Sequence, residues 1–247
     1  MLFLPSHREE IIRPYKRKGD PEIDGSALMV MVPDILRRLL KISKHNKIKS
    51  YSHTFFKSYR IKHENGSYSS LAGPFLGAPQ AVLGMEKLIA LGAKSIWVIG
   101  YCGSLNSELR IGDILIPVDA VSEEGTSGHY PIAGKTIKTA WDLNNRLANL
   151  LEKNSLPYKY GRVWTTDAPY RETIEKIKMY MNDGIMGVEM ELSALLTVAV
   201  YREIKLSGLL LVSDELFDLK WCPGFSSPIL KKRSRQAGEL ILGLLTS

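Results

Sequence analysis

Three carboxylates occur in two short motifs whose residue types suit acid–base chemistry on a polar ligand. Glu189 and Glu191 flank Met190 between a short apolar run and a segment of helical periodicity, and Asp214 follows Ser213 at the end of another apolar run. Carboxylates near a helix amino terminus are stabilised by roughly 0.3–1 kcal/mol, so a purely structural role is the alternative for the first pair. Helix capping is the corresponding alternative for Asp214. Taken together, one carboxylate can hold sugar hydroxyls while another donates a proton.

The chain is organised around residues 92–117. The run from Ser95 to Ile99 is apolar after its first residue, rich in β-branched and aromatic side chains, and lies between Gly92 and Gly100. Such a run is typical of a strand that is buried on both faces. Gly100 and Gly103 predict a sharp turn after it, in which the backbone approaches a ligand closely. Because ligands of open α/β sheets bind where strands end, we expect the site at this edge.

Hydrophobic periodicity predicts strands that alternate with amphipathic helices. Strands are expected at residues 27–32, 52–62, 67–72, 95–99, 114–116, 160–166 and 207–212, with a hairpin turn at 64–66. Helices are expected after Pro33, after Pro79, over residues 136–154 and 172–181, after Glu191 and after Pro228. We expect the polar loop 122–131 to bind rather than pack, and we interpret residues 215–226 as a lid. This order predicts the α/β class, as a three-layer α/β/α sandwich with a mixed, mainly parallel central sheet.

The composition of the chain argues against several classes of protein. With 247 residues and 45% apolar residues, we expect one domain over residues 1–247, in which residues 1–25 form an irregular amino-terminal arm. The net charge of +7 is scattered apart from residues 13–18 and 231–235, so we expect a solvated basic surface and no nucleic-acid partner. Two cysteines and five mostly isolated histidines predict no disulfide framework, no metal and no cofactor. The absence of a long apolar run predicts a cytoplasmic protein without a membrane partner.

Seven short motifs follow one another along the chain. They are Pro33-Asp34 with Arg37, Ser52-His53-Thr54-Phe55-Phe56, the loop from Gly73 to Pro79, Ile99-Gly100-Tyr101-Cys102-Gly103, Ile111-Gly112-Asp113-Ile114-Leu115, Val188-Glu189-Met190-Glu191 and Val212-Ser213-Asp214. Their joint order closely resembles the nucleoside phosphorylase and nucleosidase family, which includes uridine phosphorylase, hexameric purine nucleoside phosphorylase and methylthioadenosine nucleosidase. The likeness runs from about Ala27 onward.

The resemblance implies cleavage of the N-glycosidic bond of a nucleoside, with phosphate as the second substrate. It implies that Glu191 receives the ribose 2′- and 3′-hydroxyls and that Met190 packs against the sugar, with Glu189 and His53 as further ribose-binding residues. Asp214 would protonate the leaving base. An acid at this position is similar to the purine members, so the resemblance favours a purine nucleoside.

The other residues that the resemblance implies would contact the base and the phosphate. The base-binding residues would be Thr166, Asp167, Tyr170 and Val188, and the phosphate-binding residues would be Arg37, Gly77, Tyr101, Cys102 and Gly103. Pro169 stands where the family commonly places a base-stacking Phe. Trp164 and Tyr170 are the candidate substitutes.

The phosphate positions depart most from the family pattern. Thr54 stands where the arginine of a neighbouring subunit belongs, and Val98 stands where many members have an arginine. Phe75 replaces a glycine, and Tyr101 replaces a small Ser or Thr. A dianion stripped of water needs charged donors. Arg37 is the one clear match to an arginine of the family's phosphate site. The side chains that would rebuild a site are His129, Arg171 and Arg60.

Three functions follow from this pattern of matches and departures. The first is phosphorolysis of a purine nucleoside, the second is hydrolysis on the same scaffold, and the third is nucleoside binding without catalysis. The resemblance also implies a homo-oligomer built from dimers, up to a hexamer, in which the segment around His53 faces the site of the next subunit.

Overall fold

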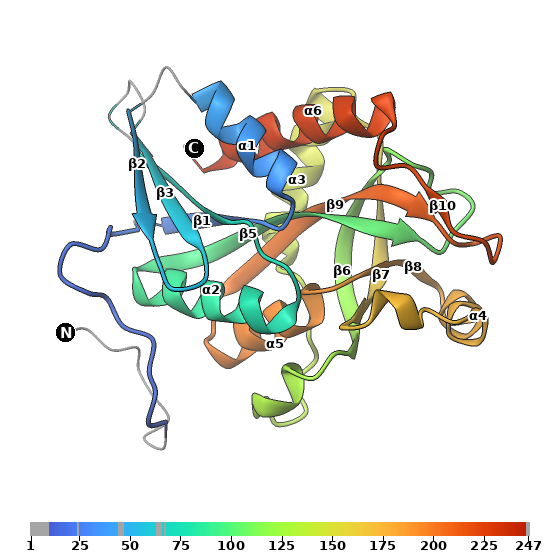
Figure 1. Ribbon diagram of the computed structural model, residues 1–247, viewed down its shortest axis with the longest axis horizontal. Coiled ribbons are helices and arrows are strands. Elements are labelled where there is room, and N and C mark those ends of the chain that lie inside the picture. Colours follow the sequence, from blue (N-terminus) through green and yellow to red (C-terminus); the bar gives the residue numbers. More distant parts are fainter. Residues whose placement is uncertain (1–9, 24, 44–46, 63–65, 67, 246–247) are drawn as a thin grey trace.

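The computed structural model describes residues 10–23, 25–43, 47–62, 66 and 68–245. Its strands are β1 (Gly25–Val30), β2 (Lys47–Ser52), β3 (Lys57–Lys62), β4 (Tyr68–Gly73), β5 (Ala93–Ser104), β6 (Ile114–Glu123), β7 (Tyr158–Thr166), β8 (Ile185–Glu189), β9 (Lys205–Glu215) and β10 (Cys222–Pro223). Its helices are α1 (Pro33–Ile42), α2 (Ala78–Ala90), α3 (Trp141–Lys153), α4 (Ile174–Asn182), α5 (Leu192–Tyr201) and α6 (Pro228–Leu244). Helices α1, α3 and α6 lie on one side of the sheet and α2 and α5 on the other (Figure 1). The predicted α/β class with three layers and a mixed sheet is confirmed.

The strands form one sheet that closes on itself over part of its width. Their order is β10-β9-β6-β7-β8-β5-β1-β4-β3-β2, and β9 pairs with β5 in addition. Strands β5, β8, β7, β6 and β9 therefore make a closed ring, which the sequence pattern did not predict. Within the ring, β5–β8 and β6–β9 are antiparallel and the other three pairings are parallel. The ring brings the ends of β8, β5 and β9 to one place.

Strand β5 separates two hydrophobic cores. Side chains alternate along a strand, so successive residues of β5 face opposite layers. Ile96, Val98 and Cys102 pack in the core beside α2 and α5, whereas Trp97 and Ile99 pack in the core beside α1, α3 and α6. This explains the continuous apolar run, because both faces of the strand are buried as predicted.

The end of β5 differs from the prediction of a sharp turn at Gly100–Gly103. The strand continues to Ser104, and Gly103 pairs with Val188 of β8 and with Asp214 of β9. A Cβ atom added to Gly103 would lie 2.6 Å from the Leu216 side chain. The glycine therefore leaves room for the Leu216 side chain beside the strand junction, and the predicted turn is wrong.

Three further boundaries differ from the predicted ones. The expected strand at 52–62 is interrupted, since β2 ends at Ser52 and β3 begins at Lys57. Most of the predicted turn at 64–66 lies outside the described residues, although the antiparallel pairing of β3 with β4 confirms a hairpin. The helix expected at 136–154 begins only at Trp141, because the Thr139 hydroxyl donates to the Pro117 carbonyl oxygen (2.8 Å) and ties this segment to β6. Strand β6 extends to Glu123, so the polar loop is shorter than expected.

Residues 10–23 form an extended arm without helix, in line with the predicted irregular segment; residues 1–9 lie outside the described part. The arm packs on its own chain. The Ile23 amide donates to the Leu91 carbonyl oxygen (2.9 Å), and Lys87 Nζ of α2 donates to the Tyr15 carbonyl oxygen and to Asp20 Oδ2, both at 2.5 Å.

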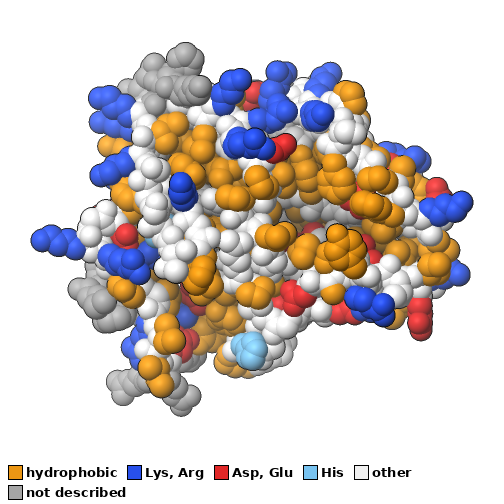
Figure 2. All heavy atoms as spheres, viewed as in Figure 1, with side chains coloured by type: hydrophobic (Ala, Val, Ile, Leu, Met, Phe, Trp, Pro, Cys, Tyr) orange, Lys and Arg blue, Asp and Glu red, His pale blue; other side chains and the backbone are white. Residues whose placement is uncertain are grey.

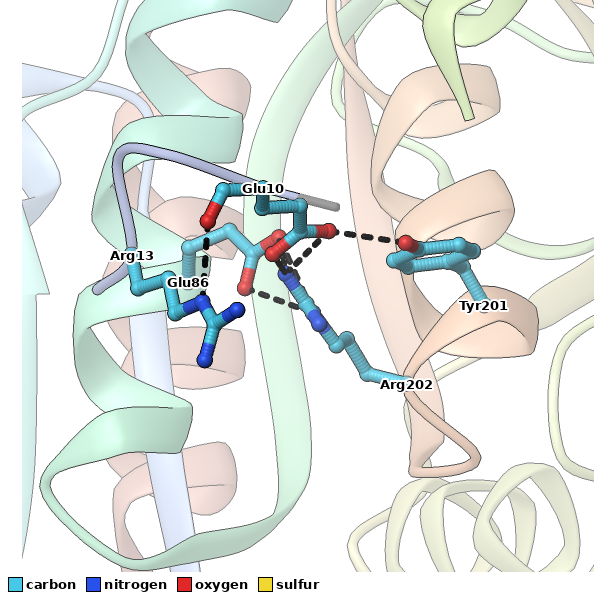
Figure 3. Close-up of polar contacts among 5 residues, drawn as sticks. All are labelled: Glu10, Arg13, Glu86, Tyr201 and Arg202. Atoms are coloured by element: carbon cyan, nitrogen blue, oxygen red, sulfur yellow. Dashed lines mark hydrogen bonds and ion pairs between the residues drawn. The ribbon is translucent and has the colours of Figure 1, made fainter. Parts of the chain in front are cut away.

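A buried ion cluster fixes the start of the described arm. Arg202, at the end of α5, donates to Glu86 of α2 (2.9 Å) and to Glu10 of the arm (3.3 Å), and the Tyr201 hydroxyl donates to Glu10 (2.8 Å) (Figure 3). The Arg202 and Glu86 side chains are only 6% and 9% exposed. The cluster therefore joins the arm, α2 and α5 in a place that water hardly reaches.

The basic residues of α1 and α6 gather on one layer of the molecule (Figure 2). An apolar band lies below them on the same face (Figure 2). Among the residues that the structure describes, no helix combines the length and apolar character needed to cross a bilayer.

We predict that Glu86→Ala lowers the free energy of unfolding by about 3 kcal/mol, because it leaves Arg202 buried with one partner fewer. Urea unfolding followed by circular dichroism measures this. The control is Lys205→Ala, which breaks the exposed pair with Asp142 and should cost under about 1 kcal/mol. Equal losses in the two variants would contradict the importance given to the buried cluster.

Candidate functional site

The two carboxylate motifs found in the sequence come together at the end of the strand ring. Glu189 ends β8, Glu191 directly precedes α5, and Asp214 lies one residue before the end of β9. Gly103 of β5 pairs with both flanking strands at this level. The predicted site residues on these strands are therefore neighbours in space.

Glu189 is buried, and both of its carboxylate oxygens accept hydrogen bonds from the same chain. Its Oε1 accepts the Thr165 hydroxyl, and its Oε2 accepts the backbone amides of Glu191 and Leu192, both at 2.7 Å. Burial raises its pKa to about 7, against these hydrogen bonds, which favour the charged form. Both oxygens are used to hold the start of α5. The structure thus gives Glu189 the structural role in place of the predicted ribose contact.

Glu191 links the start of α5 to the loop before α2. Its Oε1 accepts the Gly77 amide at 2.6 Å, and the residue is 8% exposed. Burial, followed by the charge of Glu189, raises the pKa of Glu191 to about 8. Gly77 has φ +82°, a conformation that favours glycine. The Gly77 amide, predicted to bind phosphate, is instead the partner of Glu191.

Asp214 is half-buried, and two side chains hold its carboxylate. The Ser213 hydroxyl donates to Oδ1 (2.6 Å) and the Trp221 indole Nε1 donates to Oδ2 (2.9 Å). Glu172, just before α4, lies close enough that burial and then the charge of Asp214 raise its pKa to about 7. Sequence reasoning missed Trp221 and Glu172. Their positions in loops far along the chain gave no periodic signal, although Trp221 belongs to the segment interpreted as a lid.

The residues predicted to bind the base are only partly assembled. Thr166 is buried and accepts the Ala168 amide (3.3 Å), and Asp167 accepts the Gly125 amide (2.9 Å). Val188 is buried beside Trp164 in a small core. Tyr170 is fully exposed, so its ring packs on nothing.

Neither aromatic substitute for the missing Phe is placed to stack on a base. Trp164 is fully buried and stacks on Tyr180 with ring centroids 4.4 Å apart, because β7 directs it toward α4. Tyr170 lies in a short 3-10 helix at Pro169–Arg171 that points it to solvent. In this conformation Trp164 is therefore not available to a base, and stacking by Tyr170 stays a prediction.

The predicted phosphate residues lie on different faces of the sheet. The Tyr101 hydroxyl lies 3.3 Å from the Ser234 hydroxyl of α6, whereas Cys102 packs on the opposite face beside α2 and α5. Cys102 is buried, and burial raises the pKa of its thiol strongly. Alternation along β5 is the physical reason that Tyr101 and Cys102 cannot bind one anion with their side chains.

Arg37 and His53 share one cleft of about 620 Å³ beside the loop from Gly73 to Pro79, and Lys57 lines it too. Arg37 is exposed and pairs with Asp34. The His53 ring stacks on Phe56 (4.6 Å) and its Nε2 lies 2.8 Å from the Ser58 hydroxyl. Burial and the charge of Lys87 lower the pKa of His53. This cleft therefore brings one predicted phosphate residue, Arg37, beside one predicted ribose residue, His53.

The three side chains proposed to rebuild the phosphate site are not part of this cleft. Arg60 lies over the Tyr68 ring (3.8 Å), and Arg171 is exposed. His129 lines an adjacent cavity of about 560 Å³ under the arm, which shares His53, Phe55 and Phe56 with the cleft. Lys57 was missed because a lysine on an exposed strand gives no distinctive signal. Within the described ranges, no group of three or more His, Cys, Asp or Glu side chains is arranged to hold a metal ion.

Residues 27–245 match the family model described as the phosphorylase superfamily. Among curated relatives, the chain is similar to the DeoD-type purine nucleoside phosphorylase of Clostridium novyi (strain NT), with 27% identity over 159 residues that cover 61% of this chain and 66% of the relative. It is also similar to a guanosine phosphorylase of Halorubrum lacusprofundi, with 24% identity over 152 residues that cover 62% of this chain and 63% of the relative. The match spans just under two thirds of the length of these relatives.

Two solved structures share the fold. The purine nucleoside phosphorylase of Toxoplasma gondii, in complex with immucillin-H, aligns with a TM-score of 0.80 and 22% identity, over 94% of this chain and 93% of that one. The uridine phosphorylase of Vibrio fischeri ES114 aligns with a TM-score of 0.77 and 21% identity, over 89% of this chain and 91% of that one. At these identities the likeness establishes the fold.

We predict that Glu172→Gln flattens the pH dependence of stability between pH 5 and 8. The folded-state pKa of Glu172, about 7, is above its ordinary value of 4.5. Its contribution to stability is therefore fully present below about pH 4.5 and is lost as the pH rises through about 7. Glutamine cannot ionise, so the variant should lose less Tm than the native protein between pH 5 and 8.

Thermal unfolding at several pH values measures this effect. Glu175→Gln, an exposed position on α4, is the control and should keep the native slope. Parallel Tm curves for the native protein and Glu172→Gln would contradict the prediction. The residual slope in the variant is expected from Glu189 and Glu191, whose pKa values are also raised.

Proposed function

Because the chain belongs to the phosphorylase superfamily, we propose that it cleaves the N-glycosidic bond of a nucleoside, preferably a purine nucleoside, with phosphate as the acceptor. The observation that carries this proposal is the placement of Glu191 and Asp214 at adjoining strand ends of one ring. The names of the similar proteins, purine nucleoside and guanosine phosphorylases, support the preference for purines.

The reaction breaks the bond between C1′ of the sugar and a ring nitrogen of the base. As the bond lengthens, the sugar gains oxocarbenium character and the base gains electron density. A phosphate oxygen then forms the new bond to C1′, and the base leaves with a proton. The protein accelerates such a reaction by binding this charge distribution better than it binds the ground state.

In the proposed reaction Glu191 receives the ribose hydroxyls. In the free protein, burial and the charge of Glu189 raise the pKa of this carboxyl and so favour its protonated form. Two hydroxyl groups that donate to this carboxyl would favour its charged form, so nucleoside binding is coupled to release of a proton. The bond from the Gly77 amide keeps one oxygen fixed while this happens.

Asp214 is the group proposed to give the leaving base its proton. The Ser213 hydroxyl and the Trp221 indole fix both of its oxygens, so the carboxyl has one orientation. Glu172, with a pKa of about 7, holds a proton beside it near neutral pH. In the proposed cycle Glu172 passes this proton to Asp214 after each turnover and takes up another from solvent.

The cleft that holds Arg37, Lys57 and His53 is the proposed phosphate site. Its two cationic side chains offer charge-assisted hydrogen bonds, and the loop from Gly73 connects it to Glu191 through Gly77. Hydrolysis is the second candidate, favoured by the exposure of Arg37 and by the direction of Tyr101 toward α6. A weakly held phosphate would leave water as the acceptor.

We predict that Asp214→Asn lowers turnover of purine nucleosides at least tenfold while the fold is kept. Tenfold corresponds to about 1.4 kcal/mol in the barrier, the low end of what general acid catalysis supplies. The measurement is release of free base from inosine, adenosine and uridine, with and without phosphate. Turnover that requires phosphate supports phosphorolysis, and turnover indifferent to it supports hydrolysis.

The matched control is Asp218→Asn, an exposed aspartate on the same connection, which should keep native turnover. Native activity in Asp214→Asn would remove Asp214 from the mechanism. Binding of nucleosides without release of base by the native protein would indicate the third function, a silent binding protein.

A homo-oligomer built from dimers is proposed as the working form. Exposed apolar side chains lie on the arm, on the segment between β2 and β3, in the loop before α2 and on α2 itself; they are Ile11, Ile12, Phe55, Leu76 and Leu83. Three of them line the 560 Å³ cavity under the arm. An exposed apolar group of this size is typical of an interface between protein chains.

We predict that Leu83→Glu converts the native oligomer to smaller species, because it buries a charge in the proposed interface. Sedimentation velocity at micromolar concentration measures the change. Met179→Glu on α4 is the control, since Met179 and Leu83 are similarly exposed, at 47% and 52%. A native protein that sediments as a monomer, or an oligomer unaffected by Leu83→Glu, would contradict the proposed interface.

A further inference from the structure

The connection between β9 and α6 is anchored to the strand that carries Asp214. Cys222 and Pro223 form β10, which pairs with Glu215 and Asp214, and the Gly224 amide donates to the Ser213 carbonyl oxygen at 2.8 Å. Gly224 has no room for a side chain, because a Cβ atom there would lie 2.6 Å from Ile111. The backbone next to Trp221 is therefore fixed beside the carboxylate.

The Trp221 side chain is open to solvent although its polar atom is engaged. The residue is 64% exposed, while Nε1 donates to Asp214 Oδ2 at 2.9 Å. Phe225, 53% exposed, has its ring centroid 6.5 Å away. Two large apolar rings are thus presented to water next to the proposed proton donor. Together they offer an exposed aromatic surface on which a planar ligand can pack.

The other aromatic side chains considered for the base do not combine these features. Trp164 is enclosed in its own core, and Tyr170 stands fully in solvent. A nucleobase has two apolar π-faces, and aromatic side chains are the usual surface on which bases stack. Of the three rings, the indole of Trp221 is the one that donates a hydrogen bond to Asp214.

We propose that Trp221 is the residue on which the nucleobase stacks, and that its indole N–H keeps Asp214 directed at the same base. This inference rests on the proposed cleavage of nucleosides and names the specificity-determining side chain of that site. The indole nitrogen can only donate a hydrogen bond. Each carboxylate oxygen has two acceptor positions, so Oδ2 can hold the indole N–H and still face a base.

Kinetic constants distinguish the two contributions of Trp221, which are stacking on the base and the hydrogen bond from its indole N–H to Asp214. Trp221→Phe keeps an aromatic ring and removes the N–H, so it should lower kcat about tenfold with KM for the nucleoside changed less than twofold. Trp221→Ala removes both, so it should lower kcat similarly and raise KM about tenfold. A merely structural role would give the same pattern in both variants, because either change would disturb the loop.

Trp141 provides the matched control. It is 60% exposed and lies at the start of α3, where its ring contacts Tyr160. Trp141→Phe and Trp141→Ala should leave kcat and KM within twofold of native values. Kinetic constants within twofold of native in both Trp221 variants would overturn the proposal, as would equal changes of KM in Trp221→Phe and Trp221→Ala.

A binding experiment keeps this inference separate from the proposed reaction. Titration with hypoxanthine and adenine should quench tryptophan fluorescence in the native protein and in Trp141→Phe, and the quenching should disappear in Trp221→Phe. Calorimetry should give a dissociation constant about tenfold higher for Trp221→Ala than for the native protein. Quenching that persists in Trp221→Phe, or absence of base binding by the native protein, would overturn the stacking role. Base binding of the expected kind without any nucleoside turnover would leave the stacking role standing and defeat the proposed reaction.

Discussion

The proposed site depends on the place where three strands of the ring meet at Gly103. This residue of β5 pairs with Val188 of β8 and with Asp214 of β9. A Cβ atom there would lie 2.6 Å from the Leu216 side chain, and 3.2 Å from both Asp214 Oδ2 and Val188. A side chain would therefore have to displace Leu216 and would press on residues of both neighbouring strands. Because Glu191 follows β8 and Asp214 belongs to β9, this junction sets how the two carboxylates lie relative to each other.

Closure of the ring places several carboxyls where water cannot fully solvate them, and the structure offsets this in two ways. Glu189 is compensated by two backbone amides and the Thr165 hydroxyl, in keeping with the rule that buried polar groups are hydrogen-bonded. Burial also raises the pKa values of Glu189, Glu191 and Glu172, which reduces the charge that must be buried near neutral pH. The result is a site that holds exchangeable protons, as acid catalysis requires.

The sequence was sufficient to predict the layers, the buried strands and the two carboxylate motifs, because these depend on local periodicity and on residue types. It was not sufficient to predict features that depend on contacts between residues far apart in the sequence. Gly103 looked like a turn because a glycine needed for strand packing has the same sequence signal as a glycine needed for a turn. Tyr101 was assigned to the anion although alternation along β5 directs it toward α6. Trp221 and Glu172 could not be recognised as site residues from the sequence, because only the fold brings them to Asp214.

Several cations of this basic chain form ion pairs, and the strength of each pair decides whether the cation can bind an anion instead. Arg202 is enclosed by two carboxylates, and an anion that replaced them would leave buried charges unpaired, so this guanidinium is committed to the fold. Arg37 also has a partner, Asp34, but their side chains are 75% and 65% exposed, and exposed pairs contribute only about 0–1 kcal/mol. A charge-assisted hydrogen bond to phosphate contributes about 1.5–3 kcal/mol. The balance therefore favours release of Arg37 from Asp34 when a dianion enters the cleft, so the pairing in the free protein does not argue against a phosphate site there.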